Sequence, residues 1–72
     1  MEKIVFNTLI SQRTGLRLSV ADVAKHVGVS RETVYNWEKG KTVPEVKYLN
    51  KLSEILQLDI GILVTYFENR SK

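Results

Sequence analysis

Three side chains that can pair with the edges of DNA bases lie close together in SRETVYNWEKG, residues 30–40. Arg31 can donate two hydrogen bonds to guanine, Asn36 can pair with adenine, and Glu32 can accept from the amino group of cytosine. At about 100° per residue on a helical wheel, Glu32 and Asn36 lie opposite Trp37. The spacing predicts a helix with one buried side and one side free for hydrogen bonding.

The neighbouring side chains can contact a DNA backbone. Thr33 and Tyr35 can touch thymine methyl groups or phosphates. Lys39, Lys41 and Thr42 follow where the chain would leave the groove, close to a backbone strand. A polar face of mixed charge is also typical of a helix that merely faces solvent. The sequence on either side of this helix is therefore needed to distinguish the two interpretations.

These elements are predicted to be helices, because apolar residues recur at intervals of three and four, not two. Five helices are expected, at about residues 2–14, 20–27, 31–39, 44–56 and 60–68, and residues 69–72 are expected to be frayed. Only Gly28 and Val29 separate the second helix from Ser30, which caps the third. Two short helices joined by such a tight turn form the helix-turn-helix pattern.

Capping residues set the expected ends of these helices. Gly15 is a candidate C-terminal stop for the first helix. Ser19 can cap the second, with Asp22 completing a capping box. Pro44 suits the first turn of the fourth helix, and Asp59 is expected to cap the fifth.

Apolar stripes identify the expected inner faces. On the first four helices the predicted inward residues are Val5, Phe6, Leu9, Ile10 and Arg13; Val20, Val23, Ala24 and Val27; Val34, Trp37 and Glu38; and Val46, Leu49, Leu52, Ser53 and Leu56. On the fifth they are Ile60, Leu63, Val64 and Phe67.

Glu38 is a carboxylate on an inward face, and such a group needs a partner. Arg13 is the basic residue on the inward face of the first helix. We therefore expect a structural ion pair between Arg13 and Glu38, and breaking one side of a buried pair typically costs about 3–5 kcal/mol. The alternative is that each side chain reaches solvent separately.

The composition limits the classes of function. The chain has 72 residues and no cysteine, which excludes disulfides, thiolate zinc sites and thiol nucleophiles. We expect one domain over residues 1–72 and a cytoplasmic location, in a bacterium or a phage-infected host, because neither a membrane span nor a good signal peptide is evident. A net charge of +3 and a pI of about 9.4 suit a polyanionic partner.

Asp22, His26 and Ser30 are spaced by four residues, but they do not form a convincing catalytic triad. Ser30 is used as a helix cap, and no glycine-rich nucleophile turn accompanies it. One histidine and scattered carboxylates also make no metal set. We expect no enzyme activity, metal, cofactor or small-molecule ligand.

The last predicted helix carries a second apolar stripe, formed by Ile62 and Tyr66, besides the stripe that completes the core. A helix that is apolar on several sides usually has a partner. We expect Ile62, Tyr66 and Phe67 to form a protein interface, although scattered exposure of apolar residues is also common. The partner could be a second copy, placing two reading helices about 34 Å apart, or a different regulator protein.

Residues 9–63 resemble the Cro/C1-type, or XRE-type, helix-turn-helix family, which has a lambda-repressor-like fold. The matching positions are Arg13, Leu18, Ser19, Val23, Ala24, Gly28, Val29, Ser30, Trp37, Glu38, Lys39, Gly40, Pro44, Leu52, Ile55, Leu56 and Leu63. The resemblance implies a compact five-helix all-α domain that binds double-stranded DNA operators as a dimer. It also implies the Arg13–Glu38 pair.

The resemblance places the base-reading positions on Ser30, Arg31, Glu32 and Asn36, with backbone contacts near Lys39 and Lys41. Two positions depart from the family pattern. Val20 replaces a glutamine that usually touches a phosphate, and Gln12 occupies a position that is often apolar. Glu32 adds a negative charge at the DNA surface, so it needs a donor on a base or the support of Arg31.

Two functions are consistent with these features. The first is a sequence-specific transcriptional regulator, similar to phage or plasmid repressors and Cro-like switch proteins, which inserts helix 31–39 into the major groove. The second is an antirepressor or antitoxin that acts mainly by binding another protein through its apolar C-terminal helix.

Overall fold

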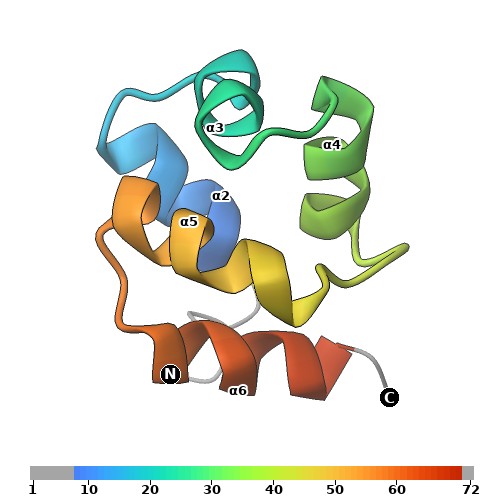
Figure 1. Ribbon diagram of the computed structural model, residues 1–72. Coiled ribbons are helices and arrows are strands. Elements are labelled where there is room, and N and C mark those ends of the chain that lie inside the picture. The colour runs from blue at the N-terminus through green and yellow to red at the C-terminus, as the bar shows by residue number, and fades with distance from the viewer. Residues whose placement is uncertain (1–7, 71–72) are drawn as a thin grey trace.

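The computed structural model describes residues 8–70, and this part of the chain contains helices and no strands (Figure 1). The helices are α2 (Thr8–Gly15), α3 (Val20–Val27), α4 (Arg31–Lys39), α5 (Val46–Leu56) and α6 (Ile60–Arg70). The prediction of a compact all-α fold with five helices is confirmed. Residues 2–7 of the first predicted helix, with Val5 and Phe6, lie outside the described residues.

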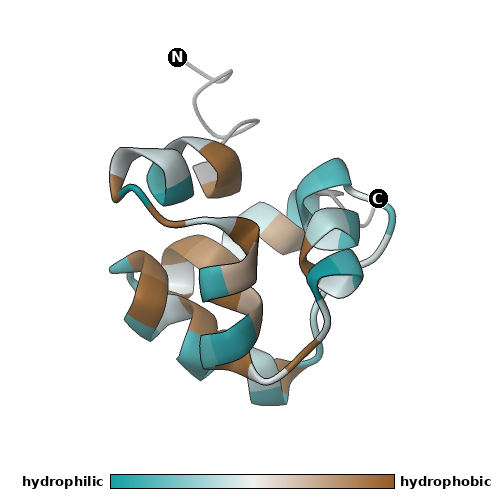
Figure 2. Cartoon of the chain, turned by 90° about the horizontal axis from the view of Figure 1, so that it is seen from above, coloured by the Kyte–Doolittle hydropathy of each residue, from teal (hydrophilic) through white to brown (hydrophobic). Residues whose placement is uncertain are grey.

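Helix α5 lies at the centre of the arrangement and contacts α2, α3 and α6, while α3 also packs against α4 (Figure 1). The radius of gyration is 10.9 Å, close to the roughly 11 Å expected for a compact domain of this length. Figure 2 shows hydrophilic and hydrophobic residues interspersed along the helices. Each helix can therefore turn one side to the core and another to solvent.

The core collects residues from all five helices. It consists of Leu9, Val20, Val23, Ala24, Val27, Val34, Trp37, Leu49, Leu52, Leu56, Leu63, Tyr66 and Phe67. Most of these positions follow the predicted stripes. Four residues placed on inner faces by the sequence are exposed instead: Ile10, Val46, Ile60 and Val64.

The predicted caps at the starts of α3 and α6 are confirmed. The Ser19 hydroxyl accepts from the Asp22 amide at 3.0 Å, and the Asp22 carboxylate accepts from the Ser19 amide at 2.9 Å. Asp59 accepts from the Gly61 amide at 2.9 Å. The expectation for α5 is corrected, because Glu45 is its N-cap and Pro44 lies outside the helix.

The chain leaves four helices through residues in the left-handed conformation: Arg17, Gly28, Gly40 and Gln57. After each of them, the next amide donates back five residues, as Leu18 does to the Arg13 carbonyl at 3.0 Å. This is the Schellman motif. The expected stop at Gly15 is therefore wrong: Gly15 is still helical, and the left-handed residue comes two positions later.

The capping box makes the start of α3 sensitive to acid. Hydrogen bonds from the Ser19 amide and then from its hydroxyl hold the pKa of Asp22 below its usual value of 3.8. Desolvation opposes this effect, and the nearby Lys25 charge adds a smaller lowering. A lowered pKa in the folded state means that this stabilisation is complete above pH 3.8 and is lost as the pH falls through the folded-state value.

We therefore expect the stability difference between wild type and Asp22→Asn to shrink as the pH is lowered below 3.8. Urea unfolding followed by circular dichroism over a pH series measures this difference. A difference that stays constant down to the acid limit of folding would show that the ionised carboxylate contributes nothing.

Among residues 8–70, no helix combines the length and the apolar character that a membrane crossing requires.

Candidate nucleic-acid interface

The turn between α3 and α4 sets the direction of the helix that carries the polar face. Gly28 has φ 92°, a conformation that a glycine adopts without strain. Ser30 then begins α4, and its hydroxyl accepts from the Thr33 amide at 3.1 Å. Figure 1 shows α3 nearly end-on, while the axis of α4 runs from top to bottom in the plane of the picture, so the two helices cross steeply. The short turn therefore holds α4 at the edge of the molecule.

An ion pair fixes α4 to α2. Arg13 Nε donates to Glu38 Oε2 at 2.7 Å, and the two side chains are 15% and 7% exposed. A second nitrogen of the same guanidinium, Nη1, donates to the Leu18 carbonyl at 3.0 Å. Arg13 therefore connects α4 both to α2 and to the turn that follows α2.

Apolar contacts hold the same side of α4. Val34 and Trp37 are buried, and the Trp37 ring lies 5.9 Å from the Tyr48 ring, centroid to centroid, at an interplanar angle of 43°. Such tilted aromatic pairs add stabilisation beyond their buried area. The inward side of α4 is thus occupied by Val34, Trp37 and Glu38, so its opposite side faces solvent.

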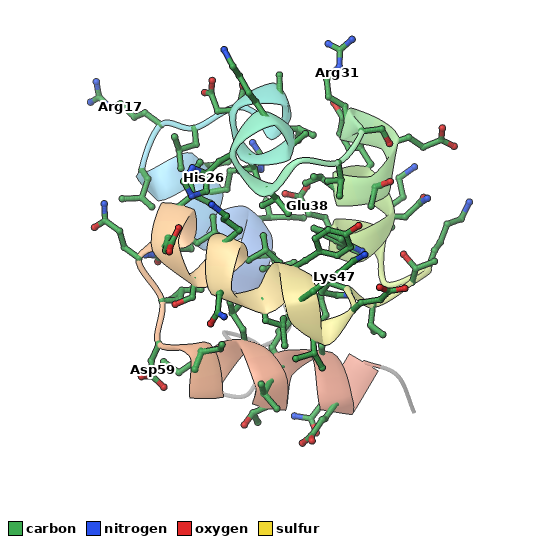
Figure 3. The ribbon with its side chains drawn as sticks, in the orientation of Figure 1. Arg17, His26, Arg31, Glu38, Lys47 and Asp59 are labelled. Atoms are coloured by element: carbon green, nitrogen blue, oxygen red, sulfur yellow. The ribbon has the colours of Figure 1, made fainter. Side chains whose placement is uncertain are left out.

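The outer side of α4 carries the predicted base-reading residues. Ser30, Arg31 and Glu32 are exposed, and Asn36 is partly exposed. Within residues 8–70, the side chains of Arg31, Glu32 and Asn36 form no hydrogen bond or ion pair, so Glu32 is not held by Arg31. Figure 3 shows Arg31 extending away from the molecule at the start of α4. Their hydrogen-bonding groups are therefore available to a ligand.

Ser30 differs from these three residues because its hydroxyl is already engaged. Besides capping the Thr33 amide, it lies 2.9 Å from the Thr33 hydroxyl. Thr33 is itself only partly exposed. The hydroxyls of Ser30 and Thr33 therefore stabilise the start of α4, whatever else they contact.

The predicted flanking residues also lie at the surface. Gly40 ends α4 in the left-handed conformation, and the Lys41 amide then donates to the Asn36 carbonyl at 2.9 Å. Lys39, Lys41 and Thr42 are exposed, as is Tyr35 on the outer side of the helix. The cations at this end face solvent, which suits contacts with phosphates.

The residues considered for catalysis have other contacts. His26 Nε2 lies 3.1 Å from Glu54 Oε1 in an exposed pair between α3 and α5. Asp22 and Ser30 each take part in a helix cap. No group of three metal-ligating side chains occurs among residues 8–70.

The predicted interface on α6 requires a correction. Tyr66 and Phe67 are 2% and 6% exposed, so they belong to the core of this chain and leave little surface for a partner. Their rings also contact each other edge to face, 5.1 Å between centroids. Of the three predicted interface residues, only Ile62 is exposed.

A different apolar surface lies where the segment before α5 meets α6. An open groove of about 250 Å³ is lined by Val43, Pro44, Val46, Leu49, Val64, Phe67 and Glu68. Val46 is 80% exposed at its edge. The sequence pattern missed this groove because Val46 and Val64 sit at helical spacings that also fit an inner face.

Comparisons with known proteins agree with this geometry. A family model described as helix-turn-helix matches residues 9–63, which include α3, the turn and α4. Searches of curated proteins and of solved structures found no significant match.

Proposed function

Because the chain belongs to the XRE-type helix-turn-helix family of DNA-binding transcription regulators, we propose that it binds specific DNA sequences by inserting α4 into the major groove. A major groove about 12 Å wide accepts one α-helix. In this arrangement Arg31 pairs with guanine, Asn36 with adenine, and Glu32 accepts from cytosine. Ser30 lies beside them at the start of the helix.

One observation supports this proposal most strongly. Helix α4 buries Val34, Trp37 and Glu38 on one side. The side chains of Glu32 and Asn36 on the other side, and of Arg31 in the first turn, have no partner within the described part of the chain. Lys39 and Lys41 at the exit of the helix add positive charge for the backbone.

Arg31→Ala and Asn36→Ala are each expected to weaken binding to the preferred duplex by about 1–3 kcal/mol, or about 5- to 150-fold. Each variant removes one bidentate contact and should relax specificity at one base pair. Fluorescence anisotropy with a labelled duplex measures the loss. Lys51→Ala, which removes an exposed cation from α5, is the matched control and should bind within about twofold of wild type. Equal losses in all three variants would argue against base reading by α4.

We further propose that the protein acts as a phage- or plasmid-type repressor in the cytosol of a bacterium or phage-infected cell. Repressors of this kind bind as two-fold dimers, with reading helices one DNA turn apart. A second copy could pack against the apolar groove at Val43, Val46 and Val64. The test is whether selected operators contain two half-sites about one helical turn apart.

The alternative proposal is an antirepressor or antitoxin, and the groove beside α6 favours it. Exposed apolar surface of this kind often marks a protein interface, and Val46 is 80% exposed there. Val46→Asp should then abolish binding to a neighbouring regulator while leaving DNA binding intact. If the wild-type protein shows no preference among DNA sequences but holds such a regulator tightly, the alternative replaces the main proposal.

A further inference from the structure

Arg17 occupies a backbone position that normally favours glycine. Its φ is 62°, and it is the left-handed residue of the Schellman motif that ends α2. The Arg17 amide donates to the Thr14 carbonyl at 3.0 Å, and the Leu18 amide donates to the Arg13 carbonyl at 3.0 Å. Side chains with a Cβ are strained in this conformation. Gly28 and Gly40 fill the equivalent positions of α3 and α4.

The turn that carries Arg17 is connected to α4 through hydrogen bonds of Arg13. Arg13 Nη1 donates to the Leu18 carbonyl at 3.0 Å, immediately after Arg17, while Nε of the same guanidinium donates to Glu38 on α4 at 2.7 Å. This three-way contact is partly buried. The backbone of Arg17 is thus held in a defined place relative to α4.

The guanidinium of Arg17 is available to an outside ligand. Arg17 is exposed and forms no side-chain hydrogen bond or ion pair within residues 8–70. Figure 3 shows it extending outward from the same side of the molecule as Arg31, with α3 between the two. A helix that enters the major groove brings its flanking elements over the adjacent backbone strands.

Among residues 8–70, the first turn of α3 itself carries no cation, and Lys25 follows Asp22 by one turn, close enough to lower the pKa of its carboxylate. Val20 is buried in the core, and Ser19 and Asp22 bond to each other in the capping box. Asp22 adds a negative charge there, which disfavours an approaching phosphate. A positive side chain that extends beyond the start of α3 would offset the repulsion between Asp22 and a phosphate.

We propose that Arg17 binds a backbone phosphate of the DNA strand that flanks the groove occupied by α4. The left-handed turn directs the Arg17 side chain toward that strand. The Arg13 contacts hold the turn in a fixed position relative to α4. This inference rests on the proposed function, since α4 must be in the groove for Arg17 to reach the strand.

The test compares two glycine variants at left-handed helix ends. Arg17→Gly and Gln57→Gly relieve the same kind of backbone strain, and Gln57 (φ 54°) closes α5. Each variant is titrated with the duplex that wild type selects from a random pool, over a series of salt concentrations. Arg17→Gln keeps a long side chain without the charge, and it serves as a second variant.

Loss of one phosphate contact should make the negative slope of log K against log salt shallower by about 0.9. At 0.1 M salt this corresponds to roughly a fivefold to tenfold loss of affinity. Arg17→Gly and Arg17→Gln should both show this change, with the same sequence preference, whereas Gln57→Gly should retain the wild-type slope. Melting temperatures of the glycine variants should equal or exceed that of wild type.

A wild-type slope in both Arg17 variants would overturn the inference, as would an equally shallow slope in Gln57→Gly. These results are distinguishable from failure of the proposed function. In that case wild type itself selects no sequence, and Arg31→Ala binds random duplexes as wild type does.

Discussion

Replacing Glu38 with alanine is expected to lower the free energy of unfolding by about 3–5 kcal/mol. The substitution leaves the Arg13 guanidinium, whose side chain is 15% exposed, without its carboxylate partner. Arg13 would keep one hydrogen bond, to the Leu18 carbonyl, which cannot neutralise its charge. Urea unfolding followed by circular dichroism measures the loss.

Glu54→Ala is the matched control for this prediction, because Glu54 belongs to an exposed pair with His26. Exposed ion pairs contribute at most about 1 kcal/mol. Arg13→Ala should resemble Glu38→Ala, and the double variant should lose less than the sum of the two single variants. If Glu38→Ala costs no more than Glu54→Ala, the pair does not hold α4 in place.

Trp37→Ala is expected to cost about 3–5 kcal/mol. Trp37 is 3% exposed and packs against Tyr48 from α5, so removal of its ring leaves a cavity beneath α4. The protein has one tryptophan, and unfolding of this variant must therefore be followed by circular dichroism.

Tyr35→Ala tests whether the loss of stability depends on burial of the aromatic ring, rather than on aromatic character itself. Tyr35 lies on the same helix but is 48% exposed, and surface substitutions usually change stability by less than about 0.5 kcal/mol. Equal losses for Tyr35→Ala and Trp37→Ala would show that burial of Trp37 does not anchor α4.

Features set by neighbouring residues could be predicted from the sequence. The Ser19–Asp22 box, the Ser30 cap and the tight turn at Gly28 depend on residues close together in the chain. The buried side of α4 follows from helical spacing alone. The partner of Glu38 was also predictable, because a carboxylate beside Trp37 needs a cation and Arg13 stands on an inward face.

Several other features that depend on packing between distant segments were not predictable. Helix α6 is apolar on several sides, so its sequence did not decide whether Val64 or Tyr66 enters the core. The same holds for Val46, whose spacing fits the inner face of α5 although its side chain is exposed. Arg17 was missed because Gly15 offered a more typical helix stop, and only the hydrogen bonds of the turn place the left-handed residue at position 17.

We propose that the outer side of α4 reads DNA sequence, and selection of binding sites from a pool of random duplexes is the decisive test. Wild type should enrich one motif, and Asn36→Ala should enrich the same motif with the preference lost at one adenine position. Lys51→Ala should leave the motif unchanged. Failure of wild type to enrich any motif, or an identical motif for Asn36→Ala, would show that α4 does not read sequence in this way.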